Sequence, residues 1–204
     1  MLIKLYPENL SPRHMNMIHE CLMDGGVIIY PTDTVYSFGG NSTSMKALDK
    51  IAQLKGIKKE KAKFSLIFND LTQLSNYTRP FDKTIFKLLK RHLPGPFTFI
   101  LPANNQVHKL FQNKSKSIGI RIPDHPIPIE IIKMLGNPLV SASIHAEDAI
   151  IEYETDPEII HDDWGGQVDI VIDAGFSGNI ASTVVDCSGD EIEIIRQGKG
   201  ELEY

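Results

Sequence analysis

The sequence predicts a single α/β domain built on a mixed sheet, and three observations lead to that prediction. The chain has 204 residues, of which 42% are hydrophobic and 23% charged, as in an ordinary soluble globular protein with a substantial core. Short apolar runs alternate with helix-like segments along the whole chain. The sequence shows no internal repeat and no Gly/Ser-rich linker, so we expect residues 1–204 to form one domain, with a core from about 11 to 198.

Capping signals and apolar spacing predict the helices. Ser11-Pro12 begins one helix, which Gly25 ends, and Ser44 caps a second helix in SMKALDKIAQLK. A third helix is expected over 81–93 and a short one in PIEIIKML, which Gly136 ends. The third helix is expected to turn these apolar residues inward: Phe81, Ile85, Phe86, Leu88 and Leu89.

Apolar or alternating runs of four to seven residues predict the strands. They are 27–30, 64–68, 98–101, 118–122, PLVSAS (138–143), VDIVIDA (168–174), STVVDC (182–187) and IEIIR (192–196). The acidic stretch from Glu147 to Asp163 is expected to be a long surface excursion.

Several features bear on the compartment. The first residues, MLIKLYPENL, contain no apolar signal region, and no apolar run approaches the ~20 residues that span a bilayer. Cys21 and Cys187 lie far apart without metal-ligand spacing, which favours two buried thiols in a reducing compartment. We therefore expect a cytoplasmic protein with no membrane partner.

Charge is distributed unevenly along the chain. Residues 1–144 hold 19 Lys and Arg against 10 Asp and Glu, a balance of +9, and residues 145–204 hold 2 against 16, a balance of −14. This asymmetry indicates either a basic surface for a phosphate-bearing partner or mutual neutralisation of the two parts in the fold.

Polar side chains gather where strands are expected to end. In YPTDTVYSFGG (30–40), Thr32, Asp33 and Thr34 directly follow a predicted strand. The other polar residues in or beside predicted strands are Arg121, Ser141, Ser143, Ser182, Thr183 and Arg196. Singly, each has an ordinary explanation, since hydroxyls satisfy nearby backbone groups and a strand arginine usually faces water. Together they resemble the polar strand ends with which α/β folds build ligand clefts.

Six motifs in this order resemble the Sua5/YciO/YrdC family. They are YPTDTVYSFGG, LPGPFTFIL, SIGIRIPDHP, PLVSAS, STVVD and IIRQG, and together they cover about residues 30 to 198. The resemblance implies a twisted α/β sheet with flanking helices and a positively charged concave face. It also implies synthesis of threonylcarbamoyl-adenylate from L-threonine, bicarbonate and ATP, for modification of adenosine 37 in tRNA. The loop around Lys55 is most similar to the YciO branch.

The resemblance implies a role for each polar residue. Positions that bind L-threonine correspond to Thr34, Arg121, Ser141 and Ser182, with Arg121 pairing with the substrate carboxylate. Positions that bind the nucleotide correspond to Lys55, Ser117, Ser143 and Arg196, and Lys58 or Lys59 can reach the place of a further cationic residue of the family there.

The implied chemistry needs positioning and charge neutralisation rather than a protein nucleophile. No residue is therefore assigned as catalytic, and Mg²⁺ is expected to arrive with ATP. His145, Glu147 and Asp148 are interpreted as an acidic surface loop rather than a metal site.

Four substitutions depart from the synthase pattern. Ile57 stands where the synthases carry an arginine two residues after the position of Lys55. His145 replaces an asparagine, Phe68 replaces a histidine that closes the threonine pocket in many synthases, and Ser37 replaces a glycine. Two hypotheses therefore stand: a threonylcarbamoyl-adenylate synthase, or a YciO-type protein that binds a nucleotide, double-stranded RNA or tRNA with little or no synthase activity. For the second, the seven lysines between Lys46 and Lys63 would contact an RNA backbone.

Overall fold

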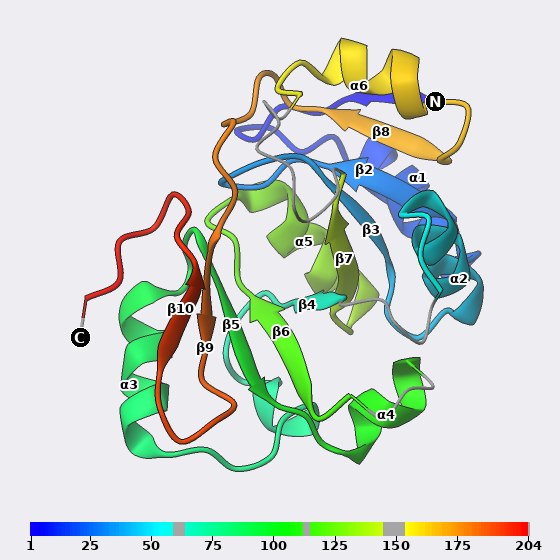
Figure 1. Ribbon diagram of the computed structural model, residues 1–204. Coiled ribbons are helices and arrows are strands. Elements are labelled where there is room, and N and C mark those ends of the chain that lie inside the picture. Colours follow the sequence, from blue (N-terminus) through cyan, green and yellow to red (C-terminus); the bar gives the residue numbers. More distant parts are fainter. Residues whose placement is uncertain (59–63, 112–114, 145–153, 204) are drawn as a thin grey trace.

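The computed structural model describes residues 1–58, 64–111, 115–144 and 154–203. The elements in chain order are β1 (Leu2–Lys4), α1 (Pro12–Met23), β2 (Val27–Tyr30), β3 (Ser37–Asn41), α2 (Met45–Leu54), β4 (Ser65–Ile67), the 3₁₀ turn η2 (Leu74–Asn76), α3 (Lys83–His92), β5 (Phe97–Pro102), α4 (Asn105–Phe111), β6 (Ser117–Arg121), α5 (Pro126–Leu135), β7 (Leu139–Ser143), α6 (Pro157–Trp164), β8 (Ile170–Asp173), β9 (Thr183–Asp186) and β10 (Glu193–Arg196) (Figure 1).

The strands form one mixed sheet in the order β1-β8-β2-β3-β7-β4-β6-β5-β9-β10. Four neighbouring pairs are parallel: β1 with β8, β2 with β8, β4 with β6, and β5 with β9. The remaining pairs are antiparallel. The predicted single α/β domain with a mixed sheet is confirmed.

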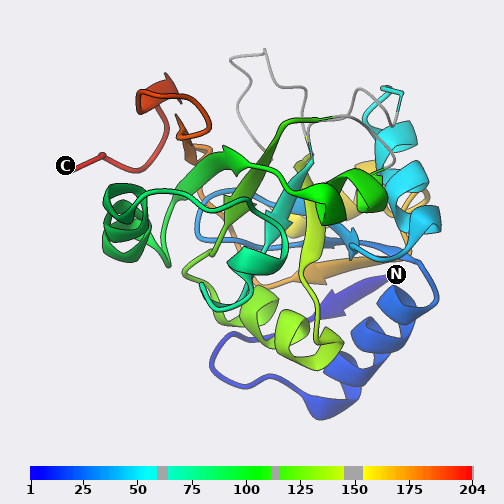
Figure 2. The same cartoon turned by 90° about the horizontal axis from the view of Figure 1, so that it is seen from below.

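Two hydrophobic clusters cover the two faces of the sheet. Helices α1 and α5 pack together over one face, where Ile67 and Leu139 are buried beneath them, and Figure 2 shows the two helices side by side. Helices α2, α3 and α6 pack over the larger cluster on the other face, where Trp164 meets Phe38 edge-on at 5.1 Å between ring centroids. Arg121 on β6 and Ser141 on β7 lie on strands held between these clusters, and Thr34 lies in the segment between β2 and β3.

The predicted helix boundaries follow local chemistry. The Ser44 side chain accepts a hydrogen bond from the Ala47 amide at the start of α2, as a capping serine does. Gly136 ends α5 in the left-handed conformation, with φ 71°. Ser11 stands at the start of α1, but its side chain makes no capping hydrogen bond, so Pro12 carries the signal there.

Some sequence predictions were incomplete or wrong. Strands β1 and β3 and helices α4 and α6 were not predicted, and α6 lies inside the acidic stretch that was interpreted as a surface excursion. Phe86 was predicted to point inward but is 44% exposed. Residues 145–153 of the acidic stretch lie outside the described residues.

Candidate functional site

Arg121 is the centre of the site. It ends β6, and its side chain is only 8% exposed, so the ordinary alternative of a strand arginine that faces water does not apply to it. Its Nη2 donates to Thr34 Oγ1 at 2.7 Å and Thr32 Oγ1 at 3.3 Å, and it forms an ion pair with Asp33. The structure therefore brings together Arg121 and Thr34, two residues that the resemblance assigns to one pocket.

On the sheet face to which Arg121 points, the neighbouring strands carry small residues. Strand pairing sets Gly39, Ser141, Ser65 and Gly119 in one cross-strand row. Paired residues point to the same side of a sheet, and so do residues two apart on one strand. Arg121 lies two residues beyond Gly119 on β6 and therefore points to this same face. It belongs to the next cross-strand row, in which it pairs with Ile67 and Ile67 pairs with Leu139.

Tyr30 holds Ser141 in place. The Tyr30 hydroxyl donates to Ser141 Oγ at 2.9 Å, and Ser141 Oγ donates to the Phe38 carbonyl at 3.0 Å. The tyrosine ring lies over Gly39, where a Cβ atom would come within 2.7 Å of it, which explains the glycine. Burial raises the pKa of Tyr30 to about 12, so its hydroxyl stays protonated.

Ser182 and Arg196 form a second part of the site. Arg196 donates from Nη2 and Nε to the Ser182 carbonyl, at 2.9 and 3.2 Å. Ser182 Oγ lies 2.8 Å from Thr98 Oγ1 on β5, the strand next to β6. Ser182 and Thr98 are both buried. The register thus places this pair near the β6 end that carries Arg121.

The segment after β10 connects the two parts. The Lys199 amide donates to the Ala181 carbonyl at 2.9 Å, and Lys199 Nζ donates to the Asp33 carbonyl at 2.6 Å. Gly198 lies so close to the backbone of Ala181 and Ser182 that a Cβ atom would come within 2.3 Å of the Ala181 oxygen. A glycine is required there to deliver the lysine.

The structure brings only some of the predicted nucleotide-binding residues into contact with one another. Lys55, at the end of α2, donates from Nζ to the Ser143 carbonyl at 2.9 Å, which joins two of them. Ser117 begins β6 and is half-buried, and Lys58 is exposed just beyond α2. Arg196 lies with Ser182, not with Lys55, in the hydrogen bonds of the described residues.

The departures from the synthase pattern fall in different surroundings. Ile57 lies just beyond α2 and is 42% exposed. Phe68 is fully buried, and its ring centroid lies 5.4 Å from that of Tyr77. Ser37 is buried and pairs with Ser143 across the sheet. His145 lies outside the described residues.

Sequence reasoning missed part of this constellation. Asp33, Tyr30 and Thr98 contact predicted site residues, and Lys199 contacts Asp33. The acidic Asp33 was noted in its motif but given no role. The sequence signal for Lys199 is its position between two glycines, Gly198 and Gly200. In the structure, both glycines approach other chain segments closely.

His125 lies near the charged pair of Arg121 and Asp33. Burial lowers the pKa of His125, and the carboxylates of Asp33 and Asp124 act in the opposite direction. Its Nδ1 accepts from the Ile127 amide at 3.3 Å, so the neutral ring carries its proton on Nε2. The neutral histidine is therefore a hydrogen-bond donor at Nε2.

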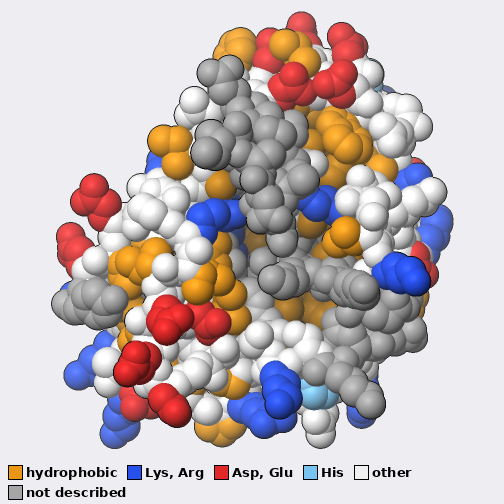
Figure 3. Space-filling view, viewed as in Figure 1, with side chains coloured by type: hydrophobic (Ala, Val, Ile, Leu, Met, Phe, Trp, Pro, Cys, Tyr) orange, Lys and Arg blue, Asp and Glu red, His pale blue; other side chains and the backbone are white. Residues whose placement is uncertain are grey.

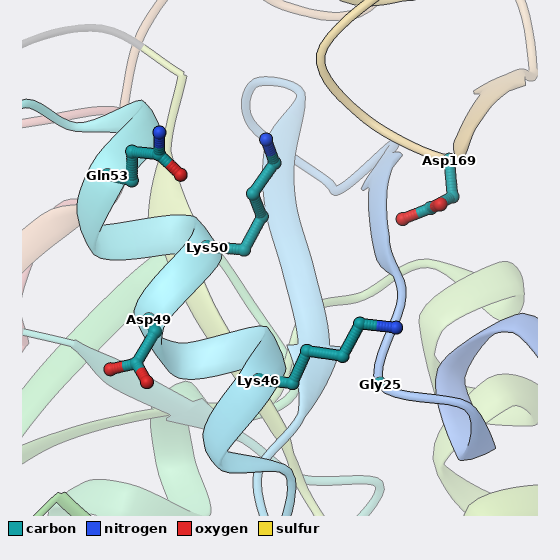
Figure 4. A pocket seen from close by; sticks show the side chains of 6 residues that line it. All are labelled: Gly25, Lys46, Asp49, Lys50, Gln53 and Asp169. Carbon is teal, nitrogen blue, oxygen red and sulfur yellow. The ribbon is translucent and has the colours of Figure 1, made fainter.

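The surface around the sheet is hollowed. In the space-filling view, Lys and Arg side chains stand on both sides of the hollowed centre, and the acidic side chains gather at the top and lower left (Figure 3). A different hollow of about 670 Å³ lies beside α2, where the Lys46 side chain extends across toward Gly25 and Asp169 (Figure 4). None of the predicted site residues lines it.

Within the described ranges, no group of three or more His, Cys, Asp or Glu residues is placed to hold a metal ion. No helix in those ranges is both long and apolar enough to cross a membrane.

The fold and site define an α/β protein with a buried arginine among hydroxyl groups at strand ends, an arrangement suited to a small anionic ligand. The chain belongs to the Sua5/YciO/YrdC family: the family model described as "Telomere recombination" matches residues 20–198.

Known proteins agree with this assignment. YciO of Escherichia coli (strain K12) is 35% identical to this protein, over 97% of this chain and 95% of its own length. The crystal structure of E. coli YciO superposes on this structure with a TM-score of 0.88 at 33% identity, and the match covers 100% of this chain and 98% of that one. A threonylcarbamoyl-AMP synthase of Bacillus subtilis (strain 168) is 30% identical over 87% of this chain and 51% of its own. The fold also matches P. abyssi Sua5 complexed with L-threonine, with a TM-score of 0.86 at 24% identity, over 97% of this chain and 57% of that one.

Proposed function

We propose that this protein is an L-threonylcarbamoyladenylate synthase: it joins L-threonine, bicarbonate and ATP to give threonylcarbamoyl-AMP, diphosphate and water. The product would serve the modification of adenosine 37 in cytoplasmic tRNA. The observation that carries the proposal is the buried guanidinium of Arg121 among Thr32, Asp33 and Thr34. The named activity of the B. subtilis relative and the L-threonine complex of P. abyssi Sua5 support it.

The reaction requires positioning more than acid–base chemistry. The threonine nitrogen forms a carbamate with bicarbonate, and a carbamate oxygen then attacks the α-phosphate as diphosphate leaves. Arg121 would hold the threonine carboxylate, since a planar guanidinium suits a carboxylate. Thr34, Ser141 and Ser182 would orient the rest of the amino acid. Their burial would keep water from the labile carbamate.

Cations at the other end of the site would stabilise the phosphates. Lys55, Lys58 and Arg196 would supply charge, and Ser117 and Ser143 would supply hydroxyl groups. With no acidic cluster among the described residues, Mg²⁺ would be held mainly by the ATP phosphates and would neutralise their charge.

A second candidate is a nucleotide- or RNA-binding protein with little synthase activity. Ile57 favours it, because this half-exposed apolar side chain adds no charge where the synthases carry an arginine. In that case the lysines from Lys46 onward would contact RNA phosphates, and binding would weaken steeply with salt.

An assay with labelled bicarbonate, L-threonine and Mg·ATP distinguishes the two candidates. We expect labelled carbamoyl-adenylate and diphosphate at a low rate. Ile57→Arg should raise that rate by one to two orders of magnitude, because one recovered charged contact lowers a barrier by roughly 1.4–2.7 kcal/mol. Ile57→Gln is the matched control, since it places a polar side chain at the same position without adding charge. If both the natural protein and Ile57→Arg bind ATP but form no adenylate, the binding function replaces the synthase.

A further inference from the structure

Two buried polar atoms in the site have no hydrogen-bond partner. They are Nε of Arg121 and Oδ2 of Asp33. The side chains that carry them are only 8% and 9% exposed. A buried donor or acceptor without a partner is costly, and natural proteins rarely keep one without a reason.

Two other groups of this pair already have partners. Nη2 of Arg121 faces three acceptors, Asp33 Oδ1, Thr32 Oγ1 and Thr34 Oγ1, although it has only two hydrogens. The Asp33 carbonyl is also occupied, by Lys199 Nζ at 2.6 Å. The two buried atoms without a partner are therefore one cationic donor, Arg121 Nε, and one anionic acceptor, Asp33 Oδ2.

The chemistry of these two atoms selects the ligand. A simple carboxylate would satisfy Arg121 Nε but would leave Asp33 Oδ2 facing a like charge. A simple cation would satisfy Oδ2 but not Nε. An α-amino acid carries a carboxylate and an ammonium on one carbon, so it supplies both partners together.

We propose that Asp33 is a specificity-determining residue whose Oδ2 accepts a hydrogen bond from the ammonium group of the bound α-amino acid, while Arg121 binds its carboxylate. The inference deepens the proposed function and rests on it for the identity of the amino acid, threonine. Asp33 would also compete with the ligand carboxylate for the guanidinium, because its Oδ1 already pairs with Nη2.

Calorimetric binding of two matched ligands tests the role of Asp33. L-Threonine and 3-hydroxybutyrate differ only in the α-amino group. We expect the natural protein to prefer threonine, and Asp33→Asn to weaken threonine binding by at least about tenfold, the effect of losing a hydrogen bond to a charged group. The same substitution should strengthen 3-hydroxybutyrate binding, because Arg121 is then less neutralised.

Opposite changes for the two ligands cannot come from misfolding, which would weaken both. Asp124→Asn, an exposed change on the segment after β6, is the matched control and should leave both affinities unchanged. If Asp33→Asn keeps the natural preference for threonine, or weakens both ligands equally, the role of Asp33 is disproved while the proposed function stands.

Serine and alanine, each with its des-amino analogue, separate the two proposals. If one of them shows the preference that depends on Asp33 and threonine does not bind, the proposed function fails and the role of Asp33 is supported. If no amino acid binds in preference to its des-amino analogue, both proposals fail.

Discussion

Two buried tyrosines near the site use their hydroxyl groups differently. The Tyr30 hydroxyl donates to Ser141 Oγ, which keeps a second bond to the Phe38 carbonyl. The Tyr36 hydroxyl instead joins two backbone groups: it donates to the Gly175 carbonyl at 2.7 Å and accepts from the Ala174 amide at 3.2 Å. Tyr36 therefore anchors the chain that leaves β8.

Replacing each tyrosine with phenylalanine should have unequal costs. Tyr36→Phe leaves two partly buried backbone groups unpaired and should lower the free energy of unfolding by about 1–3 kcal/mol. Tyr30→Phe leaves Ser141 with its other partner and should cost about 0.5–1.5 kcal/mol. Urea denaturation of the two variants measures both values. An equal cost, or a larger one for Tyr30→Phe, would contradict the anchoring role of Tyr36.

At the scale of elements, Gly40 sets the distance between β3 and α2. A Cβ atom at this position would lie 2.8 Å from Ala47 Cβ and 3.2 Å from Ile51 Cδ1, both on α2. Lys55 directly follows the helix, and its Nζ donates to the Ser143 carbonyl. Close packing at Gly40 thus helps to position a predicted nucleotide-binding lysine.

Gly40→Ala should push α2 away from the sheet. We expect a loss of ~1–3 kcal/mol in the free energy of unfolding, because Ala47 has no flexible atoms that could move aside. ATP binding should weaken as Lys55 shifts. Gly166→Ala is the control, since no atom lies within 4 Å of a Cβ there and its φ is not in the left-handed region. A cost for the control as large as that for Gly40→Ala would show that packing against α2 is not the cause.

The elements that the sequence predicted share strong local signals. Continuous apolar runs marked β2 and β8, and Ser44 and Gly136 marked helix ends. Strand β3 was missed because two of its five residues are glycines, which are depleted in strands, and only tertiary contacts with the Tyr30 ring and α2 explain them. Helix α6 was missed although Asp156-Pro157 is a start signal of the same kind as Ser11-Pro12.

The site was predictable in its residue types but not in its pairings. Arg121 and Thr34 could be selected as unusual polar residues at strand ends. Their contact, and the addition of Asp33 and Lys199, depends on long-range pairing across 87 to 166 residues, which no local pattern encodes. The polar groups of Thr98 and Tyr30 are likewise defined only by their neighbours on other strands.

At the scale of the whole molecule, the sheet interleaves early and late segments. Strand β8 lies between β1 and β2, and β9 pairs with β5. Neither half of the chain therefore contains a complete sheet of its own. The structure is expected to unfold as one cooperative unit.

The single tryptophan offers a test of that cooperativity. Trp164 packs on Phe38 of β3, so its fluorescence reports the contact between α6 and the sheet. We expect the fluorescence transition in urea to coincide with the far-ultraviolet circular dichroism transition, which reports all elements. Two separate midpoints would show that α6 and its strands unfold independently of the rest.

The place of β8 between β1 and β2 has a consequence during synthesis. About 140 residues separate the end of β2 from the start of β8. At about 5–20 residues per second, a ribosome needs roughly 7–28 s to make them. Throughout that interval the apolar β2, Val-Ile-Ile-Tyr, lacks its parallel neighbour on one edge. A nascent chain of this topology must be kept from pairing with other chains until its last quarter emerges, so translation speed and chaperone access bear directly on its yield.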